Sequence, residues 1–266
     1  VAQNNVAAFS RGHNDSAGIH VDYNNEKILV QYNFTYDNEG YGTEILGSNK
    51  NIIWRYNLSV GDGTRKVNVV RPEGGQSQHP GRTLHISDFA KPNRAPSRDI
   101  FIYNNTYLIS SGSTPNINLT AGNLLLKNNL FIVEDRAKLG QRVNIDKSWL
   151  SDFNIANNGF SGNVSSSLTK IDISPILLKL SIEGEISNAD SFAFDYQNVK
   201  LTTIGQAIDH PDFPAAGSGI FTHISREPTT DFFGNLIRKE YSFIGAGITA
   251  ESMHESTSFD LSPSES

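Results

Sequence analysis

Apolar and polar residues alternate with a period of two along much of the chain. The segments 30–36, 178–183 and 192–196 each place an apolar side chain at nearly every second position. Because successive side chains of a strand point to opposite faces, this alternation predicts antiparallel strands with one buried face. Helical periodicity is weak throughout, so the sequence predicts a mostly β protein. Three continuous apolar runs predict further strands: 52–54, 100–103 and 130–133.

Clusters of Gly, Asn and Asp separate these predicted strands, as expected of turns. Two longer segments, 71–98 and 205–219, are rich in Pro and Gly and predict irregular loops. Long ordered loops often carry function, and residues 71–98 have a net positive balance within an acidic chain. No internal repeat is apparent, and a shift in composition near 115–122 indicates a domain boundary.

Composition narrows the class of protein. The chain has 266 residues, no cysteine and a net charge of -6, and its basic residues do not cluster, which argues against nucleic-acid binding. No run of 18 uncharged apolar residues occurs, so no transmembrane helix is expected. The absence of cysteine is common in exported bacterial proteins, and Val1–Asn5 is typical of a mature end after signal-peptide removal. We therefore expect a secreted or surface-displayed bacterial protein.

Four short segments of the second half resemble the barrel of transferrin-binding-protein-B-type proteins. Residues 153–163 resemble a strand–turn–strand element of these barrels, and residues 194–201 resemble a later strand. Residues 217–221 and 244–248 look like the last strands. The usual Gly-Phe-Tyr-Gly-Pro run of the family is missing, and residues 220–223 (Ile-Phe-Thr-His) stand in its place.

Secreted hemophores of the hemophilin type are soluble relatives of that barrel. The resemblance implies an N-terminal β-rich ligand-binding clamp (1–118), a C-terminal antiparallel eight-stranded β-barrel (119–252) and a flexible tail (253–266). It also implies a function, the capture of haem outside the cell and its delivery to a bacterial outer-membrane haem receptor, with host haem proteins as further partners. Haem would then be bound as cargo.

Haem iron takes one or two axial imidazole ligands, and cationic groups hold the propionates. His79 lies in the Gly- and Pro-rich loop and His85 follows it, so this pair is the leading candidate for the axial ligands. The remaining candidates for the haem site are His20, His13, Arg82 and Tyr41. A single His is more often an ordinary surface residue than a ligand, and the basic residues of 71–98 also fit a solvated loop.

No catalytic residue is assigned, because the sequence contains no zinc-binding, nucleophile-elbow or phosphate-loop motif. Residues 37–42 resemble the start of a calcium loop, but Tyr41 and Ser48 occupy ligand positions, which favours a plain turn. Two other functions stay open. One is a surface adhesin or carbohydrate-binding module, and the other is a polysaccharide-active enzyme, since all-β lyases work with scattered Tyr, His and Arg residues.

Overall fold

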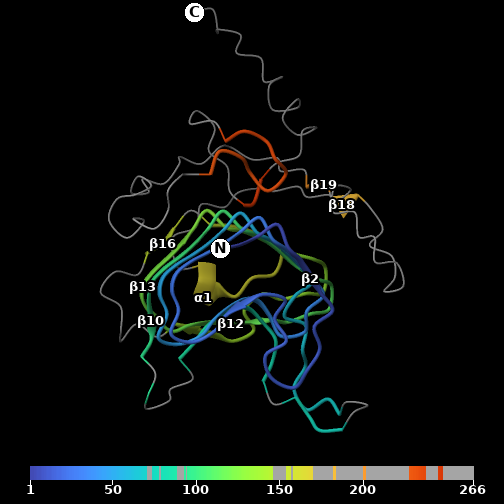
Figure 1. Cartoon of the computed structure of the whole chain (residues 1–266). Helices are drawn as coiled ribbons and strands as arrows, with labels where there is room; N and C mark the ends of the chain where they lie inside the picture. The colour runs from blue at the N-terminus through green and yellow to red at the C-terminus, as the bar shows by residue number, and fades with distance from the viewer. Residues whose placement is uncertain are drawn as a thin grey trace, which may run out of the picture.

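The chain winds into a parallel β-helix, in which each coil contributes one strand to each of three sheets (Figure 1). A computed structural model describes this architecture for most of the first 169 residues and for short later segments. The described residues are 1–70, 74–77, 79–88, 93, 95–145, 154–156, 158–169, 182–183, 200–201, 228–237 and 245–247.

Sheet A and sheet B each hold six strands, all paired in parallel. Sheet A contains β1 (Ala2–Gln3), β4 (Glu26–Gln31), β7 (Lys50–Arg55), β10 (Ser97–Tyr103), β13 (Ala121–Lys127) and β16 (Asn154–Ala156). Sheet B contains β2 (Val6–Ala8), β5 (Phe34–Tyr36), β8 (Leu58–Val60), β11 (Thr106–Ile109), β14 (Leu130–Val133) and β17 (Gly159–Ser161).

Sheet C is also parallel and closes the triangular cross-section of the coils. It contains β3 (His20–Val21), β6 (Tyr41–Ile45), β9 (Arg82–Ile86), β12 (Asn116–Leu119) and β15 (Val143–Ile145). A short helix, α1 (Ser166–Thr169), follows β17, and β18 (Ile182–Glu183) pairs antiparallel with β19 (Lys200–Leu201).

The inner faces of the three sheets form one apolar core. Side chains at equivalent positions of successive coils stack along the axis, as the rings of Tyr107, Phe131 and Phe160 do at 4.9 Å between neighbouring centroids. Trp54 lies in the same core and is 2% exposed. Each coil buries its apolar face only against the next coil, so the stack as a whole is the stable unit.

The corner between sheets A and B has two residues in every coil. The first has a left-handed conformation in the five coils where it is described, as in Tyr32 (φ 55°) and Tyr56 (φ 50°), and the second is an asparagine. The backbone N–H and the side-chain amide of Asn33 both donate to Oδ1 of Asn57, and Asn57 donates in the same way to Asn105. The full ladder comprises Asn5, Asn33, Asn57, Asn105, Asn129 and Asn158.

A described C-terminal segment packs against the outer face of sheet A. Ile237 packs against the apolar cluster formed by Ile53, Tyr56 and Tyr103. The Tyr32 hydroxyl donates to the carbonyl oxygen of Thr230. Figure 1 shows this segment, drawn in orange, above the coils. The segment therefore covers part of sheet A, whereas sheet C lies on another side of the molecule.

The predicted antiparallel eight-stranded barrel is wrong, because the three large sheets are all parallel and the described residues form no closed barrel. The period of two was interpreted correctly as strands with one buried face, but it is the same for parallel and antiparallel pairing. The segment 30–36 is broken by the corner at 32–33 and belongs to two sheets. The strands predicted at 52–54, 100–103 and 130–133 are confirmed.

Several sequence predictions fall wholly or partly outside the described residues. These are the segments 178–183 and 192–196, the loop 205–219, the tail 253–266 and most of the residues behind the barrel resemblance. All three sheets contain strands from both sides of residue 118. No helix in the described part of the chain is long and apolar enough to cross a membrane.

Candidate functional site on the outer face of sheet C

A row of polar side chains crosses the outer face of sheet C from strand to strand. The pairing places His20, Glu44, His85, Asn118 and Asn144 at the same level of successive strands. Their chain neighbours belong to the apolar core, so alternation directs this row outward. Nδ1 of His20 lies 3.3 Å from Oε2 of Glu44, and Nδ2 of Asn118 lies 3.4 Å from Nδ1 of His85. Asn144 donates to Asn118 at 2.7 Å.

A second group joins this row at the start of the same strands. Tyr41 pairs with Arg82 across β6 and β9. The Tyr41 hydroxyl accepts hydrogen bonds from Arg65 Nη2 and Arg82 Nη1, each at 3.2 Å. Both guanidinium groups lie over the Tyr41 ring, at 5.3 and 5.5 Å from its centroid, and the His85 ring lies 4.5 Å from it. Two cations therefore converge on one phenol.

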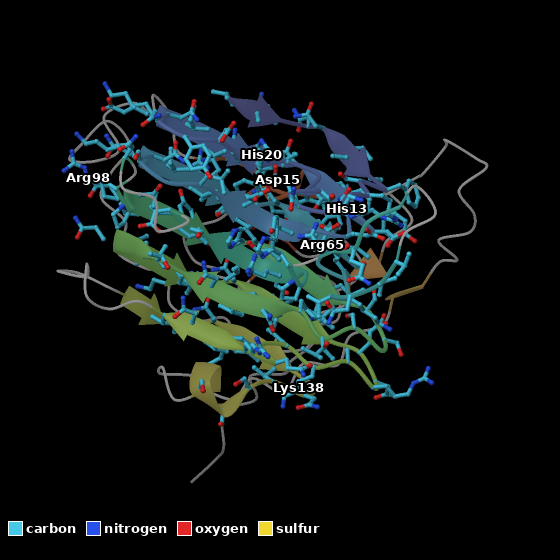
Figure 2. All side chains as sticks on the ribbon, turned by 90° about the horizontal axis from the view of Figure 1, so that it is seen from below. His13, Asp15, His20, Arg65, Arg98 and Lys138 are labelled. Atoms are coloured by element: carbon cyan, nitrogen blue, oxygen red, sulfur yellow. The ribbon has the colours of Figure 1, made fainter. Side chains whose placement is uncertain are left out.

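Arg65 also forms hydrogen bonds to two long connections beside sheet C. Its guanidinium donates to the carbonyl oxygens of Gly12, Asn14 and Asp15, which belong to the connection 9–19, and to that of His79. Figure 2 shows His13, Asp15, His20 and Arg65 gathered over one part of the molecule, away from Arg98 and Lys138. The group of Tyr41, Glu44, Arg65, Arg82 and His85, together with His20, is called the sheet C cluster below.

Glu44 is the most unusual member of the sheet C cluster. Its side chain is fully buried, and burial raises the pKa of its carboxyl above the ordinary value, although the His20 hydrogen bond opposes this shift. Oε1 has no hydrogen-bond partner among the described residues. The same contact raises the pKa of His20. A buried carboxylate with one free oxygen is costly, which makes Glu44 a candidate functional group of the site.

Two further groups of the cluster, His85 and Tyr41, have fixed protonation states near neutral pH. Burial, with the charges of Arg82, His79 and Arg65, lowers the pKa of His85 to about 2, so its imidazole is neutral. Burial raises the pKa of Tyr41 although Arg82 and Arg65 act in the opposite direction, so its hydroxyl keeps its proton. Tyr41 and His85 are each 1% exposed, whereas Arg82 and His20 reach the surface.

The structure brings four of the six predicted haem-site residues together, namely His20, His85, Arg82 and Tyr41. The other two lie on the covering connections: the His13 ring lies against Gly75, and His79 is exposed. Sequence analysis missed Glu44 and Arg65. A repeat of 24 residues was the available signal, because it relates His20 to Glu44 and Tyr41 to Arg65.

The surroundings of His85 are polar. Haem needs apolar walls around its ring, whereas Glu44, Arg65 and Arg82 surround the Tyr41–His85 pair. The described residues thus fit an anionic, hydroxyl-rich ligand better than haem, and axial ligation by His79 and His85 stays a prediction. The described residues contain no group of three or more acidic or imidazole side chains arranged to hold a metal ion.

Comparisons with known proteins add no family to this description. No protein-family model matches the chain, and no curated protein is significantly similar to it. The proposal below therefore depends on the geometry of the site alone.

Proposed function

We propose that the protein binds an acidic polysaccharide on the outer face of sheet C and cleaves it by β-elimination at the sheet C cluster. The observation that carries this proposal is the convergence of two guanidinium groups on the Tyr41 hydroxyl, beside a buried carboxylate that has one oxygen free. Elimination from a uronic acid needs a cation for the carboxylate, a base for the neighbouring proton and an acid for the leaving oxygen.

The two arginines supply the charge that this reaction requires. The proton on C5 of a uronate becomes more acidic when the adjacent carboxylate is neutralised, since negative charge accumulates there as the proton leaves. Arg82 is partly exposed and is the first cation that an entering sugar meets. A guanidinium group binds a carboxylate with two parallel hydrogen bonds, which also fixes the orientation of the sugar ring.

Glu44 and Tyr41 have the properties of the base and the acid. Glu44 is a stronger base than an ordinary glutamate because its pKa is raised, and its free Oε1 accepts the C5 proton. The C5 electron pair then forms the C4–C5 double bond while the bond from C4 to the glycosidic oxygen breaks. Tyr41, which is protonated at rest, donates its proton to that oxygen. No oxidant, reductant or metal is needed for this balance.

The outer row of sheet C suits a long ligand. Neighbouring strands lie about 4.8 Å apart, so its five side chains span about 19 Å along the axis of the β-helix. Asn118 is partly exposed and Asn144 fully exposed, and their amides bind sugar hydroxyl groups by donating and accepting hydrogen bonds. The cluster thus lies at one end of a polar track.

The connection 9–19 lies over the cluster, so a substrate must displace it. Arg65 holds this connection through backbone carbonyl oxygens, which are neutral acceptors. A uronate carboxylate is a stronger acceptor for a guanidinium group and competes for the same donors. Substrate binding and the opening of the connection are therefore coupled through Arg65.

The test is an ultraviolet assay on a panel of acidic polysaccharides, including polygalacturonate, alginate, hyaluronan and chondroitin. β-Elimination leaves an unsaturated uronate that absorbs in the ultraviolet. Glu44→Gln keeps the size of the side chain and removes the base, so we expect a loss of turnover of about 10²-fold or more with little change in substrate affinity. Glu134→Gln, an exposed position outside the cluster, is the matched control and should keep full activity.

Three outcomes would overturn the proposal. New reducing ends without ultraviolet absorbance would mean hydrolysis instead of elimination. Saturable binding without any product would favour a carbohydrate-binding module. An unchanged rate in Glu44→Gln would remove Glu44 from the mechanism.

A further inference from the structure

A groove of about 570 Å³ lies at the corner where sheet C passes into sheet A. It extends over three successive coils and lies outside the sheet C cluster. Seven of its nine lining residues are polar or charged. The lining is formed by Asn24, Asn25, Glu26, Ser48, Asn49, Lys50, Ala95, Pro96 and Arg98.

The charged side chains of the groove form a row across sheet A. The pairing of β4, β7 and β10 places Glu26, Lys50 and Arg98 at one level, and Gly122 of β13 continues the row without a side chain. Lys50 and Arg98 are thus like charges on neighbouring strands, an arrangement that costs stability. Neither forms an ion pair within the described residues, although Glu26 lies on the strand next to Lys50.

The backbone beside this row deviates from a regular strand in the same way in each coil. The residue that follows each member of the row has a left-handed conformation: Lys27, Asn51, Asp99 and Asn123, with φ between 53° and 60°. The pairing skips these four residues and resumes in the same register, so they form a backbone kink at the same level of the four strands. Asn123 donates to Asp99 at 3.0 Å, which engages the acidic side chain next to Arg98. The charged row thus lies directly before this kink.

We propose that this groove is a second binding site, which holds a carboxylate of an acidic oligosaccharide between Lys50 and Arg98. The proposal rests on the proposed function for the kind of ligand, but the two cations and the groove are independent of the sheet C cluster. Glu44 and Lys50 are six residues apart in one coil, so at most about 22 Å separates their Cα atoms. One acidic chain of several sugars therefore reaches both sites.

The polar lining supports a sugar over a small inorganic anion. Ser48 and Asn24 contribute hydroxyl and amide groups around the cations, and these groups match the hydroxyl groups of a sugar ring. Pro96 and Ala95 provide a short apolar wall on one side. The groove volume also exceeds what a sulfate or phosphate ion would occupy.

The test measures binding by calorimetry in the Glu44→Gln background, in which turnover is blocked. The ligand is a uronate oligosaccharide, and the comparison ligand is the same oligosaccharide with its carboxyl groups reduced to alcohols. We expect Lys50→Ala with Arg98→Ala to weaken binding of the acidic ligand about tenfold and to reduce its salt dependence. The reduced ligand should show no difference between the two proteins.

Lys127→Ala is the matched control, because Lys127 is on β13 of the same sheet and does not line the groove. An unchanged dissociation constant and salt dependence in the double variant would overturn the second site, whatever the activity assay shows. Suppose that the double variant binds the acidic ligand with a larger dissociation constant, but that the wild-type protein cleaves no polysaccharide. This result would support the second site, and only the elimination proposal would have failed. An equal loss of affinity for the acidic and the reduced ligand would also overturn the second site, since the site would then not recognise charge.

Discussion

The corner between sheets A and B differs sharply from the corner between sheets B and C. Every A–B connection has two residues, and every one ends in a ladder asparagine. The B–C connections vary from the short segment 37–40 to the long segment 61–81. The ladder asparagines from Asn33 to Asn158 are buried and hydrogen-bond to one another, whereas the B–C connections bring Arg65, Asp15 and His13 over sheet C.

This difference indicates that the A–B corner stabilises the fold, whereas the B–C connections can vary in length beside the candidate site. A ladder asparagine satisfies the backbone of its own corner and the backbone of the next coil, so an insertion there would leave several buried polar groups without partners. Insertions at the B–C corner run over the surface and meet no such constraint. The long connections are thus tolerated at the corner beside the sheet C cluster.

The largest expected effect on stability comes from a substitution at the centre of the asparagine ladder of the A–B corner. Asn105→Ala removes the acceptor of two hydrogen bonds from Asn57 and the donor to the carbonyl oxygens of Trp54 and Tyr103 and to Asn129. Several buried groups then lose their partners, so we expect the free energy of unfolding to fall by more than about 3 kcal/mol. Urea denaturation followed by circular dichroism measures the change.

Asn144→Ala is the matched control on sheet C, because its exposed side chain makes one hydrogen bond, to Asn118. Its expected cost is about 0.5 kcal/mol or less. If both variants lost the same stability, the A–B ladder would have no special role and the comparison of the two corners would fail.

A smaller effect is expected from Asp62. This residue ends a short series of hydrogen bonds between coils at the B–C corner. Ser10 donates to Asn38 and Asn38 donates to Asp62, whose carboxyl also accepts from Thr35 and Ser59. Burial raises the pKa of Asp62 from 3.8 to about 6. Between these values the folded state keeps a proton that the unfolded state has lost, so stability falls as pH rises from about 4 to 6, by up to about 3 kcal/mol.

Asp62→Asn removes this proton and should flatten that part of the stability–pH curve. The measurement is urea denaturation at several pH values between 4 and 7, for wild type and variant. Asp135→Asn, at an exposed position, should keep the wild-type slope. Parallel curves for wild type and Asp62→Asn would mean that Asp62 has an ordinary pKa.

The smallest expected effect is local and tests how the B–C connections are held. Arg65→Ala removes the hydrogen bonds from its guanidinium to the connection 9–19 but leaves the backbone bond from Gly40 to Ser16. We expect amides of 9–19 to exchange about tenfold faster, while amides of the ladder corner keep their rates. Hydrogen-exchange mass spectrometry gives both rates in one experiment.

Arg11→Ala is the control for Arg65→Ala, since Arg11 lies on the same connection and makes an exposed ion pair with Asp37. It should change exchange much less. Faster exchange in the ladder corner of Arg65→Ala would show that the two corners are not independent.

Part of the candidate site could be predicted from residue types alone. His85 was selected as an axial haem ligand, and Arg82 and Tyr41 as further candidates for the haem site. The structure places all three in contact, although in polar surroundings. Glu44 could not be selected, because an acidic residue inside a strand pattern usually faces solvent. Only the coverage by the connection 9–19 and the position opposite His20 make it unusual.

The sequence by itself determined that the chain forms strands with one buried face, and where many of them lie. It also contains the repeat of 24 residues in Asn33, Asn57, Asn105 and Asn129, which the long connections 61–81 and 87–96 obscure by together doubling the interval between the second and third. Tertiary structure decided which strands pair and in which direction. The physical reason is that alternation specifies the face of a strand but not its partner, whereas the position of one coil on the next fixes the partner and brings Glu44 between His20 and His85.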